Sequence, residues 1–330
     1  MTVRLLLDLA DAVGRVADGR TVKVPVETDD GAALAARWCE KTGHTFLTWR
    51  GDHVELRRGR TAEPTDEIPA AEWPARRLWL YANFDCNLAC SYCCVSSSPR
   101  TPRRELGLEL VRQIVAQAPA VGARELYVTG GEPFLLPDIA DVLRACADVL
   151  PTTVLTNAML FRRLRLAALE SLPRDGVTLQ ISLDSATADL HDRQRGAGSH
   201  ARALAGIATA LDLGFRVRIA ATLDGGQGAE ERDLHELCDR LGIPLTDRLI
   251  RRIAMEGSAT TGLVITRESL VPEICLTADG VYWHPVGATD PTMLVTTQLL
   301  PLSQAVDAVV LEYQGYRRRH DEVALSFPCA

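Results

Sequence analysis

The pattern of apolar and polar residues predicts a chain in which strands and helices alternate. From residue 77 onward, apolar runs of strand length predict strands over residues 78–82, 125–129, 152–156, 178–183, 216–222 and 248–253. Between them, apolar residues at helical spacing predict helices over about 105–118, 137–149, 161–171, 200–213 and 230–241. Such alternation implies parallel strands with the helices outside. Six strands are too few for a closed eight-stranded barrel, so we predict an α/β fold with a partial (β/α)6 barrel.

Different patterns flank this barrel. The first residues predict a helix over 5–16, a strand over 21–26, a helix over 29–41 and a hairpin over 44–57. Near the other end, residues 274–284 predict a hairpin that turns at Asp279-Gly280, followed by a helix over about 302–317. We therefore expect a small α/β domain at 1–60, a polar linker at 61–76, the barrel at 77–257, and a C-terminal hairpin and helix at 258–330 that close the barrel's open side.

Composition narrows the classes of protein. The chain has 330 residues, of which 47% are hydrophobic, and its formal net charge is −7. No block of Lys or Arg dominates, which argues against a nucleic-acid or membrane surface as partner. The N-terminus has no signal-peptide pattern, and no apolar run approaches the roughly 18 residues that cross a bilayer. We therefore expect a cytoplasmic protein.

Four of the nine cysteines fall between Cys86 and Cys94. Cys86, Cys90 and Cys93 follow the first barrel strand with the spacing Cys-x3-Cys-x2-Cys. Three thiolates on one loop can bind three irons of a 4Fe–4S cluster and leave the fourth iron open. Structural zinc is a competing interpretation, but it usually needs a fourth ligand, and Cys94 is poorly placed to share the metal with its neighbour. Inert buried thiols would leave the spacing to chance.

Other polar motifs stand where strands end, which is where chemistry sits in parallel sheets. The second strand ends at Gly130-Gly131-Glu132-Pro133, where glycines let the backbone approach a ligand and a carboxylate can accept hydrogen bonds from an ammonium group. The third ends at Thr156-Asn157, and the fourth reaches Ser182. Arg218 and Arg252 lie on the fifth and sixth strands, and the pattern does not orient them.

Together these motifs resemble the radical SAM superfamily. The resemblance implies one 4Fe–4S cluster on Cys86, Cys90 and Cys93, whose open iron binds the amino and carboxylate groups of S-adenosylmethionine. It further implies that the backbone and carboxylate of Gly130, Gly131 and Glu132 hold the amino group, that Ser182 meets the ribose or carboxylate, that Arg195 meets the carboxylate, and that Tyr92 lies beside the adenine. Two simpler interpretations stay open: Tyr92 packs in the core, and Arg195 pairs with a carboxylate such as Asp192.

The stretch from Ser182 to Ser199, with Ser-Leu-Asp, His-Asp and Arg-Gly-x-Gly-Ser, resembles the branch that includes peptide maturases and heme-biosynthesis enzymes. Many of its members carry a cysteine-rich C-terminal module with further clusters. Only Cys275 and Cys329 lie beyond residue 250, so we predict no auxiliary cluster. His284 is favoured as a structural residue over a substrate group.

The segment from about residue 5 to 59 resembles the TusA/SirA sulfur-carrier family through Gly19-Arg-Thr-Val-Lys-Val-Pro-Val and Glu40-Lys-Thr-Gly-His. Members carry a reactive Cys-Pro on the first helix, and this chain has none. A docking or stabilising domain is therefore favoured over sulfur relay.

The superfamily's chemistry is reductive cleavage of S-adenosylmethionine to a 5′-deoxyadenosyl radical, which abstracts a hydrogen atom from a substrate carbon. A flavodoxin- or ferredoxin-type protein would supply the electron. We favour a small-molecule biosynthetic intermediate as substrate, and the alternative is a maturase of a ribosomally made peptide. A non-catalytic iron–sulfur or zinc regulator would leave the glycine motif and Ser182 unexplained.

Overall fold

The computed structural model describes residues 2–17, 19–59, 68–223 and 228–326. These fall into two compact units, one formed by residues 1–68 with 314–330 and the other by residues 69–313. Residues 61–67 of the predicted linker at 61–76 lie outside the described residues. Each unit is considered by itself below.

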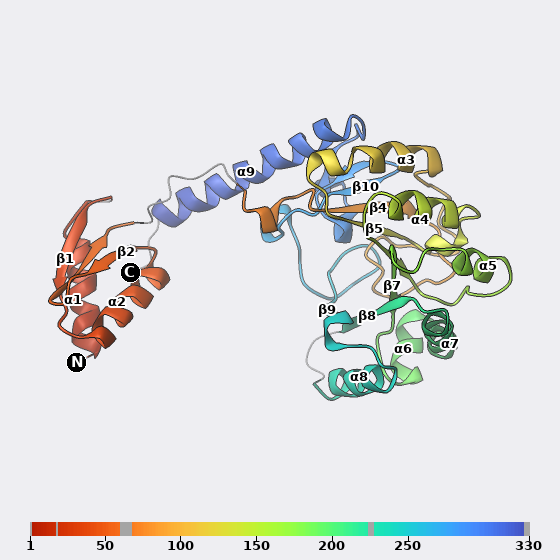
Figure 1. Ribbon diagram of the computed structural model, residues 1–330, viewed down its shortest axis with the longest axis horizontal. Coiled ribbons are helices and arrows are strands. Elements are labelled where there is room, and N and C mark those ends of the chain that lie inside the picture. The colour runs from red at the N-terminus through yellow and green to blue at the C-terminus, as the bar shows by residue number, and fades with distance from the viewer. Residues whose placement is uncertain (1, 18, 60–67, 224–227, 327–330) are drawn as a thin grey trace. The chain divides into compact units, whose positions relative to one another are not determined.

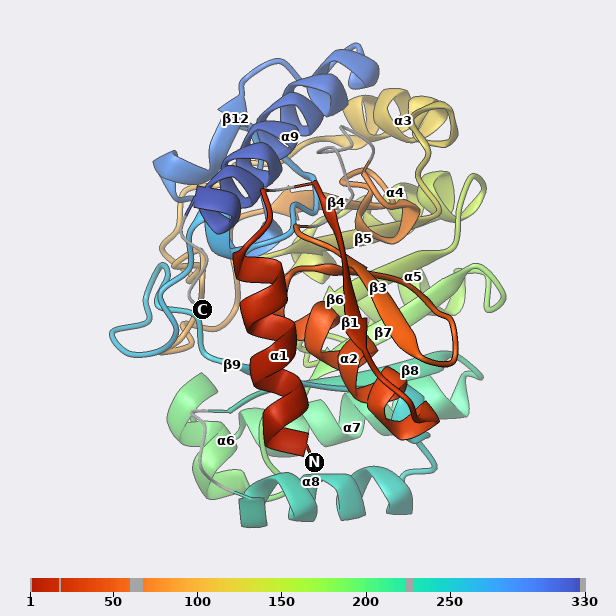
Figure 2. The same ribbon diagram turned by 90° about the vertical axis from the view of Figure 1, so that its left-hand side faces the viewer.

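The first unit is a small antiparallel sheet with two helices. Its elements are α1 (Thr2–Gly14), β1 (Thr21–Pro25), α2 (Asp29–Thr42), β2 (Thr45–Trp49) and β3 (His53–Arg57), in the predicted order. The strand order is β1-β3-β2, and Figure 2 shows α1 running alongside these strands. Thr28 begins α2 by accepting a hydrogen bond from the Gly31 backbone at 3.2 Å. The unit has its own core, which includes Leu9, Val54 and Leu56.

The second unit contains a nine-stranded sheet. Six strands are the predicted parallel ones: β4 (Arg77–Asn83), β5 (Glu125–Gly130), β6 (Thr152–Thr156), β7 (Val177–Ser182), β8 (Arg216–Leu223) and β9 (Arg248–Arg252). They are neighbours in sequence order, and each pairs in parallel with the next. This arrangement confirms the α/β class with a mostly parallel sheet.

Helices connect these strands, and Figure 1 shows α3, α4, α5 and α7 following one another along one face of the sheet. The helices are α3 (Leu108–Gln117), α4 (Ile139–Ala147), α5 (Leu164–Glu170), α6 (Ala188–Arg195), α7 (Ser199–Asp212) and α8 (Gly228–Arg240). Only α6 was not predicted. Its single buried residue is His191, so it has no apolar stripe that would reveal a helical period.

The C-terminal hairpin continues the sheet beside β4. β10 (Cys275–Thr277) pairs with β11 (Gly280–Tyr282), and β12 (Leu294–Thr296) follows before α9 (Leu302–Ser326). β10 also pairs in parallel with β4, with Cys275 opposite Trp79. The hairpin therefore extends the sheet beside β4 and does not bridge to β9, because β9 forms the opposite edge.

The two faces of the parallel strands have different roles: one packs in the core and the other lines a pocket. Leu80 and Val128 are fully buried, while their neighbours Tyr81 and Thr129 line a pocket. Because successive side chains of a strand point to opposite faces, the apolar set packs under the helices and the other set lines the inside of the curved sheet. The sheet thus presents one pocket-lining face at the carboxyl ends of its strands.

Candidate functional site

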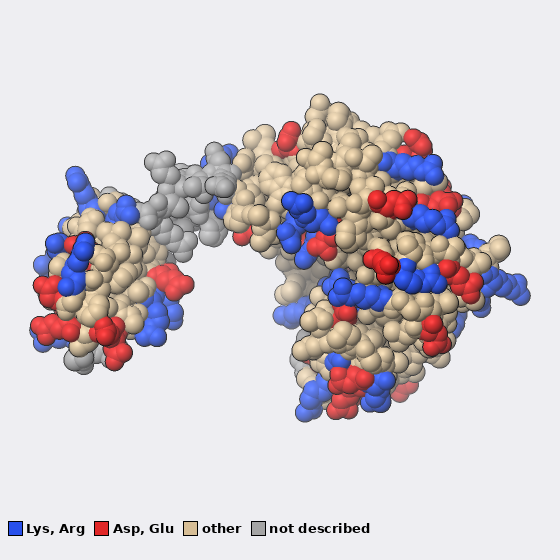
Figure 3. All heavy atoms as spheres, viewed as in Figure 1, with Lys and Arg blue, Asp and Glu red and all other residues tan. Residues whose placement is uncertain are grey.

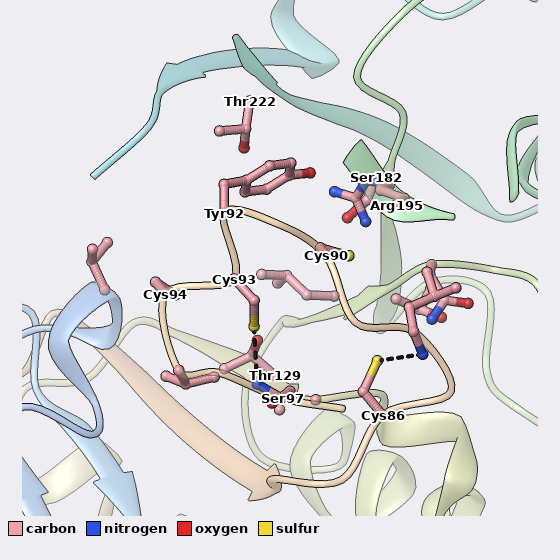
Figure 4. Close-up of a pocket in the computed structure, with 18 of the residues that line it drawn as sticks. Cys86, Cys90, Tyr92, Cys93, Cys94, Ser97, Thr129, Ser182, Arg195 and Thr222 are labelled. Carbon is pink, nitrogen blue, oxygen red and sulfur yellow. Dashed lines mark hydrogen bonds between the residues drawn. The ribbon is translucent and has the colours of Figure 1, made fainter. Parts of the chain in front are cut away.

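The loop that follows β4 carries the cysteine motif into a pocket. Cys86, Cys90 and Cys93 all line this pocket, together with residues from the ends of β5, β6, β7, β8 and β9. Figure 4 shows the loop curling along one side of the pocket with the three cysteines among the side chains drawn. The space measures about 1010 Å³ with its open mouth included. Every site residue predicted from the sequence lines it except Glu132.

Backbone hydrogen bonds hold this loop in shape. The Cys93 Sγ accepts a hydrogen bond from the Ser97 amide at 3.2 Å, and the Cys86 Sγ accepts one from the Leu88 amide at 3.4 Å (Figure 4). Two other segments, α6 and the segment after β9, form hydrogen bonds with this loop. The Ser91 amide donates to the Gln194 carbonyl at 3.0 Å, and the Ser258 amide donates to the Cys93 carbonyl at 2.8 Å. The loop geometry is thus fixed by α6 and by the segment after β9.

The arrangement of the thiols fits a multi-iron cluster better than a single metal ion. Among the described residues, no three His, Cys, Asp or Glu side chains are grouped so that they could hold one ion. A zinc ion would need its ligands within about 2.3 Å of one point, whereas each thiolate of a 4Fe–4S cluster binds its own iron. Burial raises the pKa of Cys86 to about 12 and also raises that of Cys90, so metal binding must displace protons.

Cys94 lines the same pocket but has a different neighbour. Its thiol lies near the Tyr81 hydroxyl on β4, and burial raises the pKa of Cys94 to about 12. The sequence places Cys94 next to the motif without a role, and only the fold shows that it faces the pocket.

A buried carboxylate connects Tyr92 and Arg195. Asp184 is fully buried and accepts hydrogen bonds from the Tyr92 hydroxyl, from Arg195 Nε at 2.6 Å and from the Thr222 amide at 3.0 Å. Burial alone would raise the pKa of Asp184, but the Arg195 charge and these donors hold it below its usual value. Tyr92 stands between Cys90 and Cys93, so Asp184 ties the cysteine loop to β7 and α6.

The alternative that Arg195 pairs with a carboxylate agrees with the structure, but the partner is the buried Asp184 and not Asp192. Asp192 instead accepts hydrogen bonds from the Gly198 amide at 2.6 Å, the His200 amide at 2.8 Å and the Ser199 hydroxyl at 3.1 Å. Asp192 thereby orders the start of α7, and Arg195 turns the other way toward Asp184. The ten residues between Asp184 and Arg195 include most of the unpredicted α6, which explains why the sequence did not reveal this pair.

The glycine motif lets the end of β5 touch the cysteine loop. A Cβ atom on Gly131 would lie 2.2 Å from the Asp85 carbonyl oxygen, and one on Gly130 would lie 2.4 Å from Asn83 Oδ1. No side chain fits at either position. The motif therefore brings β5 into close contact with the loop, and both glycines line the pocket.

Glu132 lies behind the glycines, away from the pocket surface. Its carboxylate accepts hydrogen bonds from the Thr156 hydroxyl at 2.8 Å, the Asn157 amide at 2.8 Å and the Phe134 amide at 3.0 Å. Burial raises the pKa of Glu132 to about 6. In this structure the side chain connects β5 to β6, and protein donors occupy both of its oxygens.

The structure orients the remaining candidates. Ser182 and Arg252 line the pocket. Arg218 is not among the described residues that line the pocket, and it donates a hydrogen bond to the Tyr127 hydroxyl at 3.2 Å. His284 accepts a hydrogen bond from the Val286 amide at 3.2 Å through Nδ1, which caps a short 3₁₀ turn. Asn157, Thr222 and Arg251 also line the pocket and were not among the predicted site residues.

Among the described residues, no helix is both long enough and apolar enough to cross a membrane.

Comparison with known proteins agrees with this site. Residues 83–241 match the family model of the Radical SAM superfamily. The AdoMet-dependent heme synthase of Methanosarcina barkeri is 32% identical over 160 residues, which cover 48% of this chain and 45% of the relative. The PqqA peptide cyclase of Ruegeria pomeroyi is 33% identical over 140 residues, which cover 42% of this chain and 37% of the relative. The chain thus spans less than half the length of these relatives.

A solved structure shares the fold. The crystal structure described as native anSMEcpe with bound AdoMet and Kp18Cys peptide matches with a TM-score of 0.56 at 11% identity, covering 72% of this chain and 82% of that one. The family match begins at residue 83, so it gives no support to the TusA/SirA resemblance of the first unit. Residues 83–241, which include all three cysteines of the motif, thus match the Radical SAM superfamily, whose members use a 4Fe–4S cluster and S-adenosylmethionine, and the partial barrel has the fold of that solved structure.

Proposed function

We propose that this protein is a radical SAM maturase that modifies a peptide. The observation that carries the proposal is the placement of Cys86, Cys90 and Cys93 around one open pocket at the carboxyl ends of the parallel strands. The sequence favoured a small-molecule substrate, and the comparisons favour the alternative that it left open. One similar protein is a peptide cyclase and another is a structure with a bound peptide, whereas the heme synthase supports the small-molecule class.

The bound cluster and S-adenosylmethionine would supply a 5′-deoxyadenosyl radical that abstracts a hydrogen atom from a substrate carbon. The chain's own residues position and shield these groups. The three cysteines hold the cluster, Gly130 and Gly131 allow close approach of the β5 backbone, and Ser182 presents a hydroxyl at the end of β7. Asp184, Tyr92 and Arg195 keep the cysteine loop in one geometry, which preserves the orientation that the reaction needs.

The pocket is open to solvent on one side, which leaves room for a substrate to approach the cofactor. Because its mouth is open, a peptide can place one residue beside the cofactor while the rest of the chain stays outside. A flavodoxin- or ferredoxin-type donor would deliver the electron, and the first unit would serve as a docking or stabilising domain.

The test is anaerobic reconstitution with iron and sulfide, followed by incubation with S-adenosylmethionine, dithionite and candidate substrates. The candidates are deuterated peptides encoded beside the gene and a matched set of deuterated small metabolites. We expect 5′-deoxyadenosine to form and to carry deuterium from a peptide. Deuterium that comes from a small metabolite alone would contradict the peptide assignment, and absence of 5′-deoxyadenosine in every reaction would contradict the radical function.

A further inference from the structure

The pocket lining carries charge of one sign. Apart from cysteines and tyrosines, the ionisable side chains among the described lining residues are Arg195, Arg251 and Arg252, with no Asp, Glu or Lys. The chain as a whole has a net charge of −7. On the face drawn in Figure 3, basic and acidic side chains are interspersed and not gathered by sign. A cationic lining in an acidic protein points to an anionic group in the ligand.

The three arginines differ in whether their charge is already balanced. Arg195 is buried and pairs with Asp184 at 2.6 Å. Arg251 and Arg252 are exposed, and neither side chain forms an ion pair or a hydrogen bond with a described residue. Their guanidinium groups are therefore available to a ligand, whereas that of Arg195 is not.

Both free arginines face the pocket because of where β9 ends. Consecutive residues of a strand normally point to opposite faces, but β9 stops at Arg252, and both side chains line the pocket. Arg251 pairs across the sheet with Thr222, whose amide donates to Asp184. The pair thus lies at the rim, close to the cysteine loop.

This rim is far along the sheet from the glycine motif. β9 is the edge strand, and β8, β7 and β6 stand between it and β5, which carries Gly130 and Gly131. If the methionine part of the cofactor lies against β5, the arginines are left at the other end of the row of parallel strands, where they can contact a second ligand.

We propose that Arg251 and Arg252 form an anion subsite that binds a carboxylate of the peptide substrate, an inference that rests on the proposed maturase function. Guanidinium groups bind carboxylates through paired, charge-assisted hydrogen bonds. Two adjacent guanidiniums can hold one carboxylate from two directions. The carboxylate belongs either to an acidic side chain or to the C-terminus of the peptide.

Three probe peptides distinguish these sources. They are acetyl-Ala-Glu-Ala-Glu-Ala-amide, acetyl-Ala-Gln-Ala-Gln-Ala with a free C-terminal carboxylate, and the amidated form of the second peptide as a neutral control. Their affinities are measured by anaerobic calorimetry on the full reconstituted chain loaded with S-adenosylmethionine. We expect one of the two peptides that carry a carboxylate to bind at least about tenfold more tightly than the neutral peptide. This preference should fall as the salt concentration rises. The peptide that binds more tightly identifies the source of the carboxylate.

Variants assign this preference to the two arginines. Arg251→Gln and Arg252→Gln should each reduce it, Arg252→Lys should restore part of it, and Arg240→Gln should leave it intact, because Arg240 is an exposed arginine of α8 outside the pocket. The inference is overturned if acidic and neutral peptides bind equally, or if the preference survives in the Arg251→Gln/Arg252→Gln double variant.

Two further readouts separate rival ligands. If the double variant loses affinity for S-adenosylmethionine by the same factor as for the acidic peptide, the arginines serve the cofactor and the inference is overturned. If only the cluster's reduction potential changes, the arginines serve the cluster and the inference is likewise overturned. Formation of 5′-deoxyadenosine by the wild-type protein in the same preparation tests the proposed function separately.

Discussion

Cys93 and Cys94 are adjacent in the chain, but their thiols have different neighbours. The Cys93 Sγ accepts a hydrogen bond from the Ser97 amide, whereas the Cys94 thiol lies near the Tyr81 hydroxyl. We therefore expect Cys94→Ala to keep the iron content and the iron–sulfur absorbance after anaerobic reconstitution, and Cys90→Ala to lose both. Loss of the cluster in Cys94→Ala would show that a fourth cysteine sulfur is a ligand.

His191 provides a prediction about pH. Its Nδ1 accepts a hydrogen bond from the Asp184 amide at 3.2 Å, and burial lowers the pKa of His191 from 6.5 to about 4. The unfolded state therefore binds a proton at a higher pH than the folded state does. The contribution of His191 to stability is full above pH 6.5 and is lost as the pH falls toward 4.

The measurement is the free energy of unfolding by denaturant at several pH values between 7 and 4. We expect the wild type to lose more stability over this interval than His191→Gln does, since Gln does not titrate. His235→Gln is the control, because His235 lies on α8 and is partly exposed. Equal pH dependence of the wild type and His191→Gln would contradict the burial argument. Comparison with the variant also cancels Glu132, whose raised pKa acts in the opposite direction.

At this scale the sequence revealed the ligands better than it revealed their supports. The cysteine spacing and the glycine motif are local, because each function is determined by residues a few positions apart. The partners of Arg195 and Glu132 are not local. Asp184 reaches Arg195 across a helix that has no apolar period, and Glu132 meets Thr156 and Asn157 from the next strand, so only the fold identifies them.

At the scale of the elements, two glycines on either side of β9, Gly242 before it and Gly257 after it, form a matched pair. Gly257 has φ +58°, and a Cβ there would lie 2.4 Å from the Cys93 carbonyl oxygen. Gly242 has φ +71°, and a Cβ there would meet nothing within 4 Å. Alanine at either position incurs the left-handed backbone strain of about 1–2 kcal/mol, but only at Gly257 does it also push against the cysteine loop.

We therefore expect Gly257→Ala to lower both the iron content after reconstitution and the free energy of unfolding by more than Gly242→Ala does. Iron analysis and denaturant unfolding of the two variants, side by side, measure the difference. If the two variants behave alike, the segment after β9 does not support the cysteine loop.

The elements themselves were largely predictable. Each parallel strand is an apolar run, and most connecting helices have an apolar stripe, so periodicity located them to within a few residues. The position of the C-terminal hairpin was not predictable in this way. β10 pairs with β4 through Cys275 and Trp79, which are almost 200 residues apart, and no local pattern encodes such a partner.

For the whole molecule, the two units predict two separable responses to core mutation. The first unit's core is built from residues between Leu5 and Leu56. Leu56→Ala should destabilise that unit by about 2–5 kcal/mol, and Leu179→Ala on β7 should act on the other unit, since both leucines are fully buried.

Hydrogen exchange read by mass spectrometry measures this peptide by peptide in the full-length protein. We expect Leu56→Ala to lower protection within residues 19–59 and Leu179→Ala to lower it within residues 125–223. Loss of protection across both ranges in either variant would mean that the two units unfold as one cooperative body.

The strand β4 pairs with β5, which is synthesised soon after it, and with β10, which is synthesised much later. β5 begins at Glu125, whereas β10 begins at Cys275, after every other parallel strand has been synthesised. Closing so long a loop is slow, because the chain must lose much of its freedom before the contact forms. During translation, β4 therefore has one edge without its final partner, β10. A chain stalled before residue 275 would expose that unpaired edge to other strands.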